Sequence, residues 1–178
     1  MNKAKGEKGE RNMDKRNRLA LGFLLAGLSA AGRALLSVPE GTSLAELSLT
    51  VLAVVGYLVL GRLGLKALLC GVGQVILELV LCGAQTEAGG AWVWLAPLLR
   101  DADLLLLTLA ALYLLTVAGY EGRALPAVLA ITWAVYAVTH FVPALSLFAA
   151  AAYVAYCVGL LWFTVRMIRA YNERRVRR

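Results

Sequence analysis

The sequence predicts an all-α integral membrane protein, a bundle of six transmembrane helices, and three observations support this prediction. Of the 178 residues, 61% are hydrophobic and only 16% are charged, whereas an ordinary soluble domain has about 45–50% apolar and about 25% charged residues. The apolar residues form long Leu, Ala and Val runs, not the polar–apolar alternation that is typical of a membrane β-barrel. Because a spanning helix needs about 20 mostly apolar residues, the chain between Arg18 and Arg166 has room for about six.

The first apolar run, residues 19–38, is expected to be a retained span. A basic stretch precedes it and small residues follow at Ser29–Ala31, a pattern that also fits a cleaved signal peptide. We favour the span because the apolar character continues to Val38, farther than the apolar core of a signal peptide usually extends.

Five further spans follow in order. Ser43, with Glu46 three residues later, forms a capping-box pattern that begins the second span. Gly61 ends that span. The fourth span begins after a charged stretch whose last residue is Asp103, and Pro143 separates the fifth span from the sixth. The expected spans are residues 44–60, 63–84, 104–119, 124–141 and 144–165.

The connection between the third and fourth spans contains an interfacial segment, residues 91–99. Trp92 and Trp94 lie in it, and tryptophan prefers the boundary between membrane and water. We therefore expect this segment to lie on the membrane surface.

The distribution of Lys and Arg predicts the orientation of the bundle. Residues 1–18 form a basic arm with seven of the 18 Lys and Arg residues, and the tail at residues 166–178 holds six more. Arg62, Lys66 and Arg123 add three at connections on the same side. Since positive charge is retained in the cytoplasm, both termini are expected there, which requires an even number of spans in the plasma membrane.

The formal net charge of +7 also fits a nucleic-acid-binding protein, but its distribution favours a different partner. The basic residues flank apolar spans instead of forming one basic domain. We expect the lipid bilayer as the main partner, anionic lipid at the two basic ends, and no nucleic acid.

Several polar residues inside or at the outer ends of the spans are candidate ligand-binding residues. Gln74 and Glu78 are four residues apart in the third span, so they share a helix face. Ionisable groups inside a bilayer are costly and often functional. The alternative for Gln74 and Glu78 is a structural hydrogen-bond network. For the two aspartates listed next the alternative is that they stabilise a helix N-terminus, and for the histidine it is a position at the membrane interface. The other candidates, at outer span ends, are Glu46, Asp101, Asp103 and His140.

Arg33 and Glu46 are expected to form a structural ion pair. They lie near the outer ends of the first two spans, which a short connection joins into a hairpin. A buried charge without a partner would be expensive, so the two side chains should lie at the same depth.

Small residues recur at four-residue spacing in the first and sixth spans. Such stripes allow close helix contacts in membranes. They predict either packing of the first span on the sixth or a docking face for a partner subunit or a second copy of the chain. The residues are Gly22, Ala26, Ala30 and Ala34 in the first span, and Ala151, Ala155 and Gly159 in the sixth.

Cofactor and enzyme motifs are not found in the sequence. Cys70, Cys82 and Cys157 all lie inside apolar runs, which predicts small buried side chains and not a disulfide or metal site. There is no His-Glu-x-x-His helix, phosphate-binding loop or Gly-x-Ser-x-Gly turn. We expect no metal and no cofactor.

The polar outer half of the bundle leads to the functional prediction. It holds more acidic than basic residues, so we expect a pocket that opens outward and binds or transports a small neutral or cationic solute. The alternative is a membrane scaffold or regulator whose buried polar residues only hold the helices together.

In its size, its even number of spans and its small-residue first helix, the chain is similar in organisation to the substrate-binding subunits of energy-coupling-factor vitamin transporters. The similarity is architectural, and no diagnostic motif accompanies it. It implies a transmembrane coupling subunit that docks on the face formed by Gly22, Ala26, Ala30 and Ala34.

Overall fold

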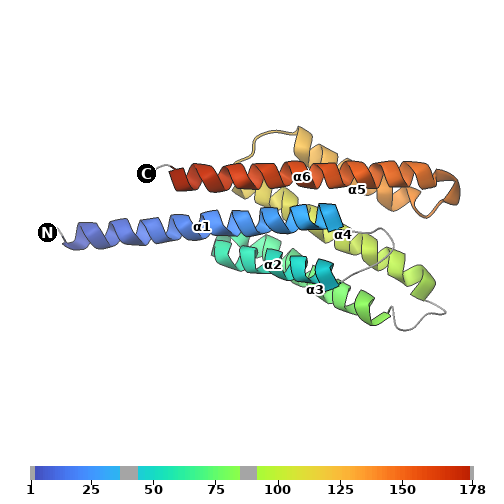
Figure 1. Ribbon diagram of the computed structural model, residues 1–178, viewed down its shortest axis with the longest axis horizontal. Helices are drawn as coiled ribbons and strands as arrows, with labels where there is room; N and C mark the ends of the chain where they lie inside the picture. The colour runs from blue at the N-terminus through green and yellow to red at the C-terminus, as the bar shows by residue number, and fades with distance from the viewer. Residues whose placement is uncertain (1–2, 37–43, 85–91, 177–178) are drawn as a thin grey trace.

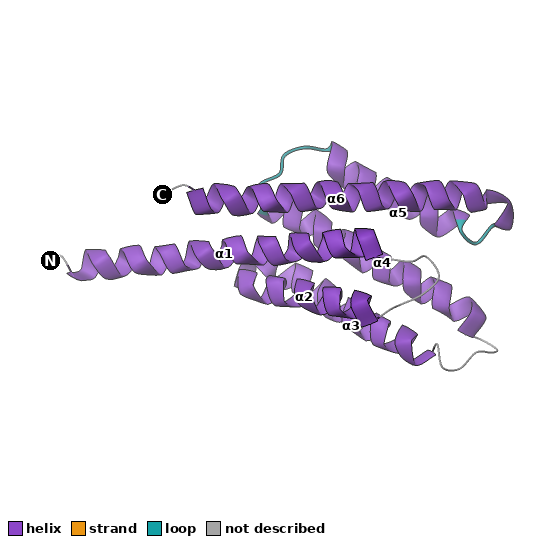
Figure 2. Cartoon of the chain, in the orientation of Figure 1, coloured by secondary structure: helices purple, strands orange, loops and turns teal. Residues whose placement is uncertain are grey.

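Long helices make up the chain in a computed structural model, which describes residues 3–36, 44–84 and 92–176. Every described element is helical (Figures 1 and 2), as the apolar runs predict. The elements are α1 (Lys3–Leu36), α2 (Leu44–Leu60), the 3-10 helix η1 (Gly61–Gly64), α3 (Leu65–Ala84), α4 (Trp92–Val117), α5 (Ala124–Thr139), the 3-10 helix η2 (Pro143–Leu145) and α6 (Ser146–Val176).

The six α-helices form a closed ring in which each packs against its neighbours in sequence and α6 returns to pack against α1. The contact between α4 and α5 is the smallest of the six. The two longest helices, α1 and α6, lie side by side, so that the first and last described residues are at the same end of the molecule (Figure 1). We call this the terminal end, and the other the distal end.

Among the described residues, three apolar helical stretches are long enough to cross a membrane: Arg16–Leu36, Leu44–Gly83 and Pro143–Arg174. The second contains α2, η1 and α3 and reverses direction near Gly61, whose φ of +61° lies in the left-handed region that glycine adopts without strain. Helix α5 is a shorter apolar helix. The count of six spans stays a prediction.

Helices α1, α4 and α6 continue beyond the apolar runs that predicted them. Residues 3–18 and 166–176, expected to be a polar arm and tail, are helical extensions of α1 and α6. Their Lys, Arg, Glu and Ala residues favour helix without needing to be buried. Residues 92–99 of the segment predicted to be interfacial likewise form the start of α4, with Pro97 in the second turn.

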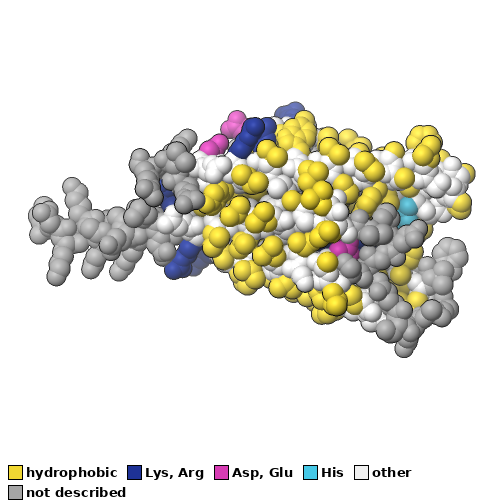
Figure 3. All heavy atoms as spheres, viewed as in Figure 1, with side chains coloured by type: hydrophobic (Ala, Val, Ile, Leu, Met, Phe, Trp, Pro, Cys, Tyr) yellow, Lys and Arg dark blue, Asp and Glu magenta, His cyan; other side chains and the backbone are white. Residues whose placement is uncertain are grey.

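Large apolar side chains cover much of the outside of the ring (Figure 3). Leu69, Val138 and Leu147 are each more than two-thirds exposed. A soluble monomer rarely exposes such continuous apolar surface, whereas a bilayer accommodates it. The η1 reversal between α2 and α3 and the connection between α4 and α5 lie toward the terminal end (Figure 1). Exposed Arg62, Lys66 and Arg123 lie in or next to these connections.

The small residues of α1 lie against α2. A Cβ atom at Gly22 would lie 2.6 Å from Leu60 Cγ and 2.8 Å from the backbone oxygen of Gly56, so the two helices touch through glycine. Ala26 and Ala30 are also buried and Ala34 is half-buried. This face is therefore largely covered within the chain, and docking of a partner subunit there stays a prediction.

The small residues of α6 do not form the expected contact with α1 either. Ala151 is exposed, Ala155 is half-buried, and Gly159 faces Leu129 of α5. Helices α1 and α6 do pack together, but through other residues: Thr164 Oγ1 of α6 donates a hydrogen bond to the Gly27 oxygen of α1 at 3.0 Å.

Candidate functional site

A group of buried polar side chains occupies the interior of the ring in its distal half. All are less than 9% exposed, and Glu78 and Asp103 are fully buried. Helices α1 to α4 each contribute at least one of them. We call this group the central network; it consists of Arg33, Glu46, Thr50, Gln74, Glu78, Arg100 and Asp103.

Helical spacing explains why these side chains converge. Glu46 and Thr50 are four residues apart in α2, Gln74 and Glu78 are four apart in α3, and Arg100 and Asp103 are three apart in α4. Residues at these spacings share one helix face. Each pair therefore points into the ring while the apolar faces of the same helices point outward.

Glu46 and Arg100 form a two-pronged ion pair across the bundle. Arg100 Nη1 donates to Glu46 Oε2 at 3.0 Å, and Nη2 donates to Oε1 at 2.8 Å. This fork geometry is the strongest form of an arginine–carboxylate contact. It ties α2 to α4, which α3 separates in the ring.

Arg33 lies between two other carboxyl groups. Its Nη2 forms ion pairs with Glu78 Oε1 and, at 3.3 Å, with Asp103 Oδ2. The expected pair of Arg33 with Glu46 is thus replaced by two separate pairings. Arg100, on the inward-facing side of α4, pairs with Glu46 instead. The sequence prediction considered only the hairpin of the first two spans, which does not include Arg100.

Neutral side chains complete the network. Thr50 Oγ1 donates to Glu78 Oε1 at 2.7 Å, and Gln74 Nε2 lies 3.4 Å from Asp103 Oδ1. Thr50 was not predicted as a site residue, although its spacing of four from Glu46 was a usable signal. Four of the predicted ligand residues, Glu46, Gln74, Glu78 and Asp103, are brought together here.

Asp101 and His140 form a separate pair between α4 and α5. Asp101 Oδ2 lies 3.7 Å from His140 Nε2, and Trp133 Nε1 donates to the backbone oxygen of Asp101 at 3.3 Å. Burial raises the pKa of the Asp101 carboxyl to about 6, and nearby His140 partly offsets this. Two residues apart on a helix point about 200° from each other, so Asp101 faces α5 while Asp103 faces the central network.

The charges of the central network do not balance. It contains three carboxyl groups and two guanidinium groups among the described residues. Glu78 Oε2, Asp103 Oδ2 and Arg33 Nε and Nη1 are buried without a hydrogen-bond partner in the described part of the chain. Buried polar atoms are usually hydrogen-bonded, so these atoms mark a place where the network can accept a further group.

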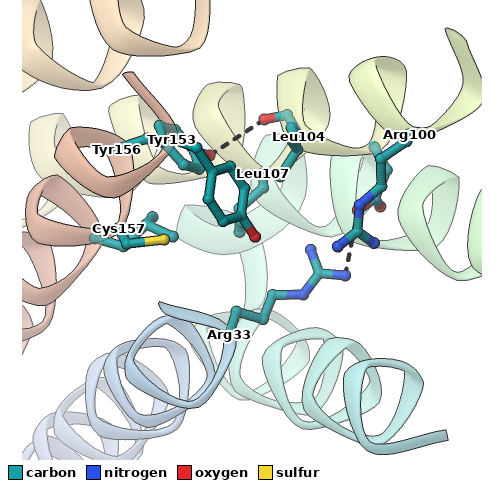
Figure 4. A pocket seen from close by; sticks show the side chains of 9 residues that line it. Arg33, Arg100, Leu104, Leu107, Tyr153, Tyr156 and Cys157 are labelled. Carbon is teal, nitrogen blue, oxygen red and sulfur yellow. Dashed lines mark hydrogen bonds and ion pairs between the residues drawn. The ribbon is translucent and has the colours of Figure 1, made fainter. Parts of the chain in front are cut away.

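A small cavity adjoins the network on the side of α6. Arg33 and Arg100 reach toward it from opposite sides, and the Tyr153 hydroxyl points toward Arg33 (Figure 4). Its volume is about 10 Å³, which is room for about one water molecule. The remaining lining residues are Asp103, Leu104, Leu107, Tyr156, Cys157 and Leu160.

An apolar layer separates the network from the terminal end. Tyr156 and Thr108 close the cavity side with a 2.9 Å hydrogen bond. Beyond them, Leu114, Phe163 and Met167 are almost fully buried. A solute at the network would therefore meet a packed core on its way toward the terminal end.

The described residues contain no group of three His, Cys, Asp or Glu side chains that could hold a metal ion. The three cysteines are free and half-buried. Comparisons with protein-family models, with curated protein sequences and with solved structures gave no match for this chain.

Proposed function

We propose that the chain is a six-span protein of the plasma membrane with both termini in the cytoplasm. Three features support this: the closed ring of six helices, the position of both ends of the chain at one end of the ring, and the basic residues near that end. Positive charge beside the spans favours the cytoplasmic side. The distal end then faces outward.

Cysteine labelling in intact cells tests this topology. In a chain with its three cysteines replaced by alanine, Ala144→Cys at the distal end should react with a membrane-impermeant maleimide. Glu121→Cys, equally exposed at the terminal end, should react only after the cells are permeabilised. Labelling of Glu121→Cys in intact cells would contradict the proposed orientation.

We further propose that the central network binds a small neutral or cationic solute that reaches it from the outer side. The single observation that carries this proposal is the set of buried atoms next to the cavity that have no hydrogen-bond partner among the described residues: Arg33 offers N–H donors, and Asp103 offers an acceptor. The excess of carboxyl groups disfavours an anion. Ionisable groups that converge inside a membrane bundle are costly to keep, and a ligand site accounts for that cost.

The cavity limits what the solute is. With room for about one water molecule, it accepts only a very small polar molecule or ion unless side chains move. The apolar layer below requires a conformational change, or a partner subunit, for release toward the cytoplasm. The chain has no nucleotide-binding motif, so it does not itself couple release to nucleotide hydrolysis.

Thermal unfolding of the purified protein tests solute binding. The probes are formamide for a neutral solute and methylammonium for a cation, with the larger N-methylglucamine as a control of equal ionic strength. A bound ligand stabilises the folded state, by about 2.7 kcal/mol at 100 times its Kd. We expect one probe to raise the Tm of the wild type.

Two matched aspartates provide the control. Asp103→Asn alters the cavity lining and should abolish the Tm shift, whereas Asp101→Asn, on the opposite face of the same helix, should keep it. If neither probe raises the wild-type Tm above the N-methylglucamine control, the solute proposal is wrong.

The alternative function is that of a membrane scaffold whose network is purely structural. The Glu46–Arg100 pair favours it, because all four of its terminal atoms are matched and it joins helices that are not neighbours in the ring. Under this alternative the network variants change stability only, and no probe shifts the Tm.

A further inference from the structure

The central network has one negative charge too many for a buried group of side chains. Glu46, Glu78 and Asp103 face Arg33 and Arg100, and all five are buried. An uncompensated charge in a low-dielectric interior costs several kcal/mol, so a buried group either finds a partner or becomes neutral.

The geometry shows which carboxyl groups share the deficit. Both oxygens of Glu46 are held by the Arg100 fork. Arg100 also acts electrostatically on Asp103, but both of its hydrogen bonds to a carboxyl group go to Glu46, so we pair these two charges. The single guanidinium of Arg33 is left to face both Glu78 and Asp103. If both carboxyl groups are ionised, the single positive charge of Arg33 leaves one negative charge uncompensated.

Each of these two carboxyl groups also has an oxygen without a donor. Glu78 Oε1 accepts from Thr50 and contacts Arg33, but Glu78 Oε2 has no hydrogen-bond partner among the described residues. Asp103 Oδ1 lies near Gln74, and Oδ2 has only the 3.3 Å ion pair with Arg33. An oxygen of this kind is where a carboxylic acid carries its proton.

Among the described residues, the cations that act on Asp103 are Arg33 and Arg100, both already counted. The remaining titratable groups that face the Glu78–Arg33–Asp103 group from α2 and α6 are acids or neutral phenols and thiols. They are Glu46, Tyr57, Tyr153, Tyr156 and Cys157.

We propose that the central network binds one proton, shared by the Glu78 and Asp103 carboxyl groups on either side of Arg33 and exchanged with water on the outer side. In the exchange a hydronium ion gives its proton to one carboxylate oxygen, one O–H bond forms, and water remains. The network is then neutral. This inference rests on the proposed function in one respect, the orientation that places the network on the outer side of the membrane. It does not depend on the binding of a solute.

The cavity gives this proton a route. It borders Asp103 and Arg33 and has room for about one water molecule, whereas Glu78 is not among its lining residues. Asp103 is therefore the carboxyl group that meets water first, and Arg33 connects it to Glu78.

Infrared spectroscopy of the purified full-length protein tests the proposal, because a protonated carboxyl group has a carbonyl stretch that a carboxylate lacks. The measurement is made at mildly alkaline pH, above the Asp101 pKa of about 6. The wild type should show this band, shifted in D2O, and should lose it reversibly at higher pH. Absence of the band from the wild type would overturn the proposal, whatever the variants do.

Isosteric variants locate the proton. Glu78→Gln and Asp103→Asn each remove the excess charge, so the remaining carboxyl group should ionise against Arg33 and the band should be lost in both. Asp101→Asn should keep the band, and a band that survives in both Glu78→Gln and Asp103→Asn would also overturn the proposal. If the wild type shows the infrared band but neither formamide nor methylammonium raises its Tm, the solute proposal is wrong and the proton proposal stands. If a probe raises the Tm but the band is absent, the proton proposal is wrong and the solute proposal stands.

Discussion

Arg100 and Glu46 are both buried, and each neutralises the charge of the other. Arg100 is 8% exposed and Glu46 is 1% exposed, and two hydrogen bonds join them. Loss of one partner leaves the other as a buried, unpaired charge, which costs about 3–5 kcal/mol. Replacement of both by apolar residues of similar size leaves no such charge behind.

We therefore predict that Arg100→Leu lowers the free energy of unfolding by about 3–5 kcal/mol, whereas Arg100→Leu combined with Glu46→Leu lowers it by much less. Reversible unfolding in mixed detergent measures both variants. A double variant that is as unstable as the sum of the two single variants would show that the pair is not coupled.

The same residues show how far the sequence predicts the site. The spacing of Gln74 and Glu78, and the position of Asp103 at the start of an apolar run, were enough to place these residues in one interior group. The partner of Glu46 was not predictable, because Arg100 is 54 residues away in the chain and the choice between Arg33 and Arg100 depends on how the ring closes. Asp101 and His140 were assigned to the same group, but helix rotation places them on another face.

At the level of helices, α1 and α2 are held together by glycine. A Cβ atom at Gly22 would approach the backbone oxygen of Gly56 to 2.8 Å, and one at Gly56 would approach the Gly22 oxygen to 3.1 Å. A backbone oxygen cannot relieve a close contact by a change of rotamer, as a flexible side chain can. A side chain at Gly22 therefore requires the two helices to shift, and one at Gly56 requires its neighbours to move by a few tenths of an ångström.

Gly22→Ala is predicted to destabilise the protein by about 1–3 kcal/mol, the usual cost of overpacking a close contact. Gly83→Ala is the control, because nothing described lies within 4 Å of its added Cβ atom. In a helix that substitution is neutral or stabilising by up to about 1 kcal/mol. Equal unfolding free energies for the two variants would contradict a close α1–α2 contact.

Helix boundaries were predictable where polarity and turn residues change together. The bounds of α2 coincide with the predicted 44–60, and Gly61 directly follows its last residue. Ser43 of the predicted capping pattern lies outside the described residues. The starts of α1 and α4 and the end of α6 were not predictable from hydropathy, because a helix continues into polar sequence wherever propensity allows it. Hydropathy locates the apolar zone and not the ends of the helices.

On the scale of the whole molecule, charge is divided along the bundle axis. The buried carboxyl groups and the Asp101–His140 pair belong to the distal half. The Lys and Arg side chains seen in Figure 3 lie toward the terminal end next to the apolar surface, with a few acidic side chains beside them. Helices α1 and α6 extend beyond the other helices at that end (Figure 1). In the orientation that we propose, this arrangement would place a ring of positive charge at the level of the cytoplasmic lipid head groups.

This ring should select anionic lipid. Each exposed Lys or Arg near an anionic surface contributes about 1 kcal/mol, so a triple variant with Arg62→Gln, Arg123→Gln and Arg169→Gln should lose about 3 kcal/mol, or about 100-fold in its preference for phosphatidylglycerol over phosphatidylcholine. Native mass spectrometry of the lipids retained by the protein measures this preference. Glu121→Gln, at the same end, is the control and should leave it unchanged or slightly raised. Because exposed charges are screened by salt, the difference between wild type and triple variant should shrink at high ionic strength. A preference that is independent of both salt and the three arginines would mean that the basic end does not bind lipid through its charge.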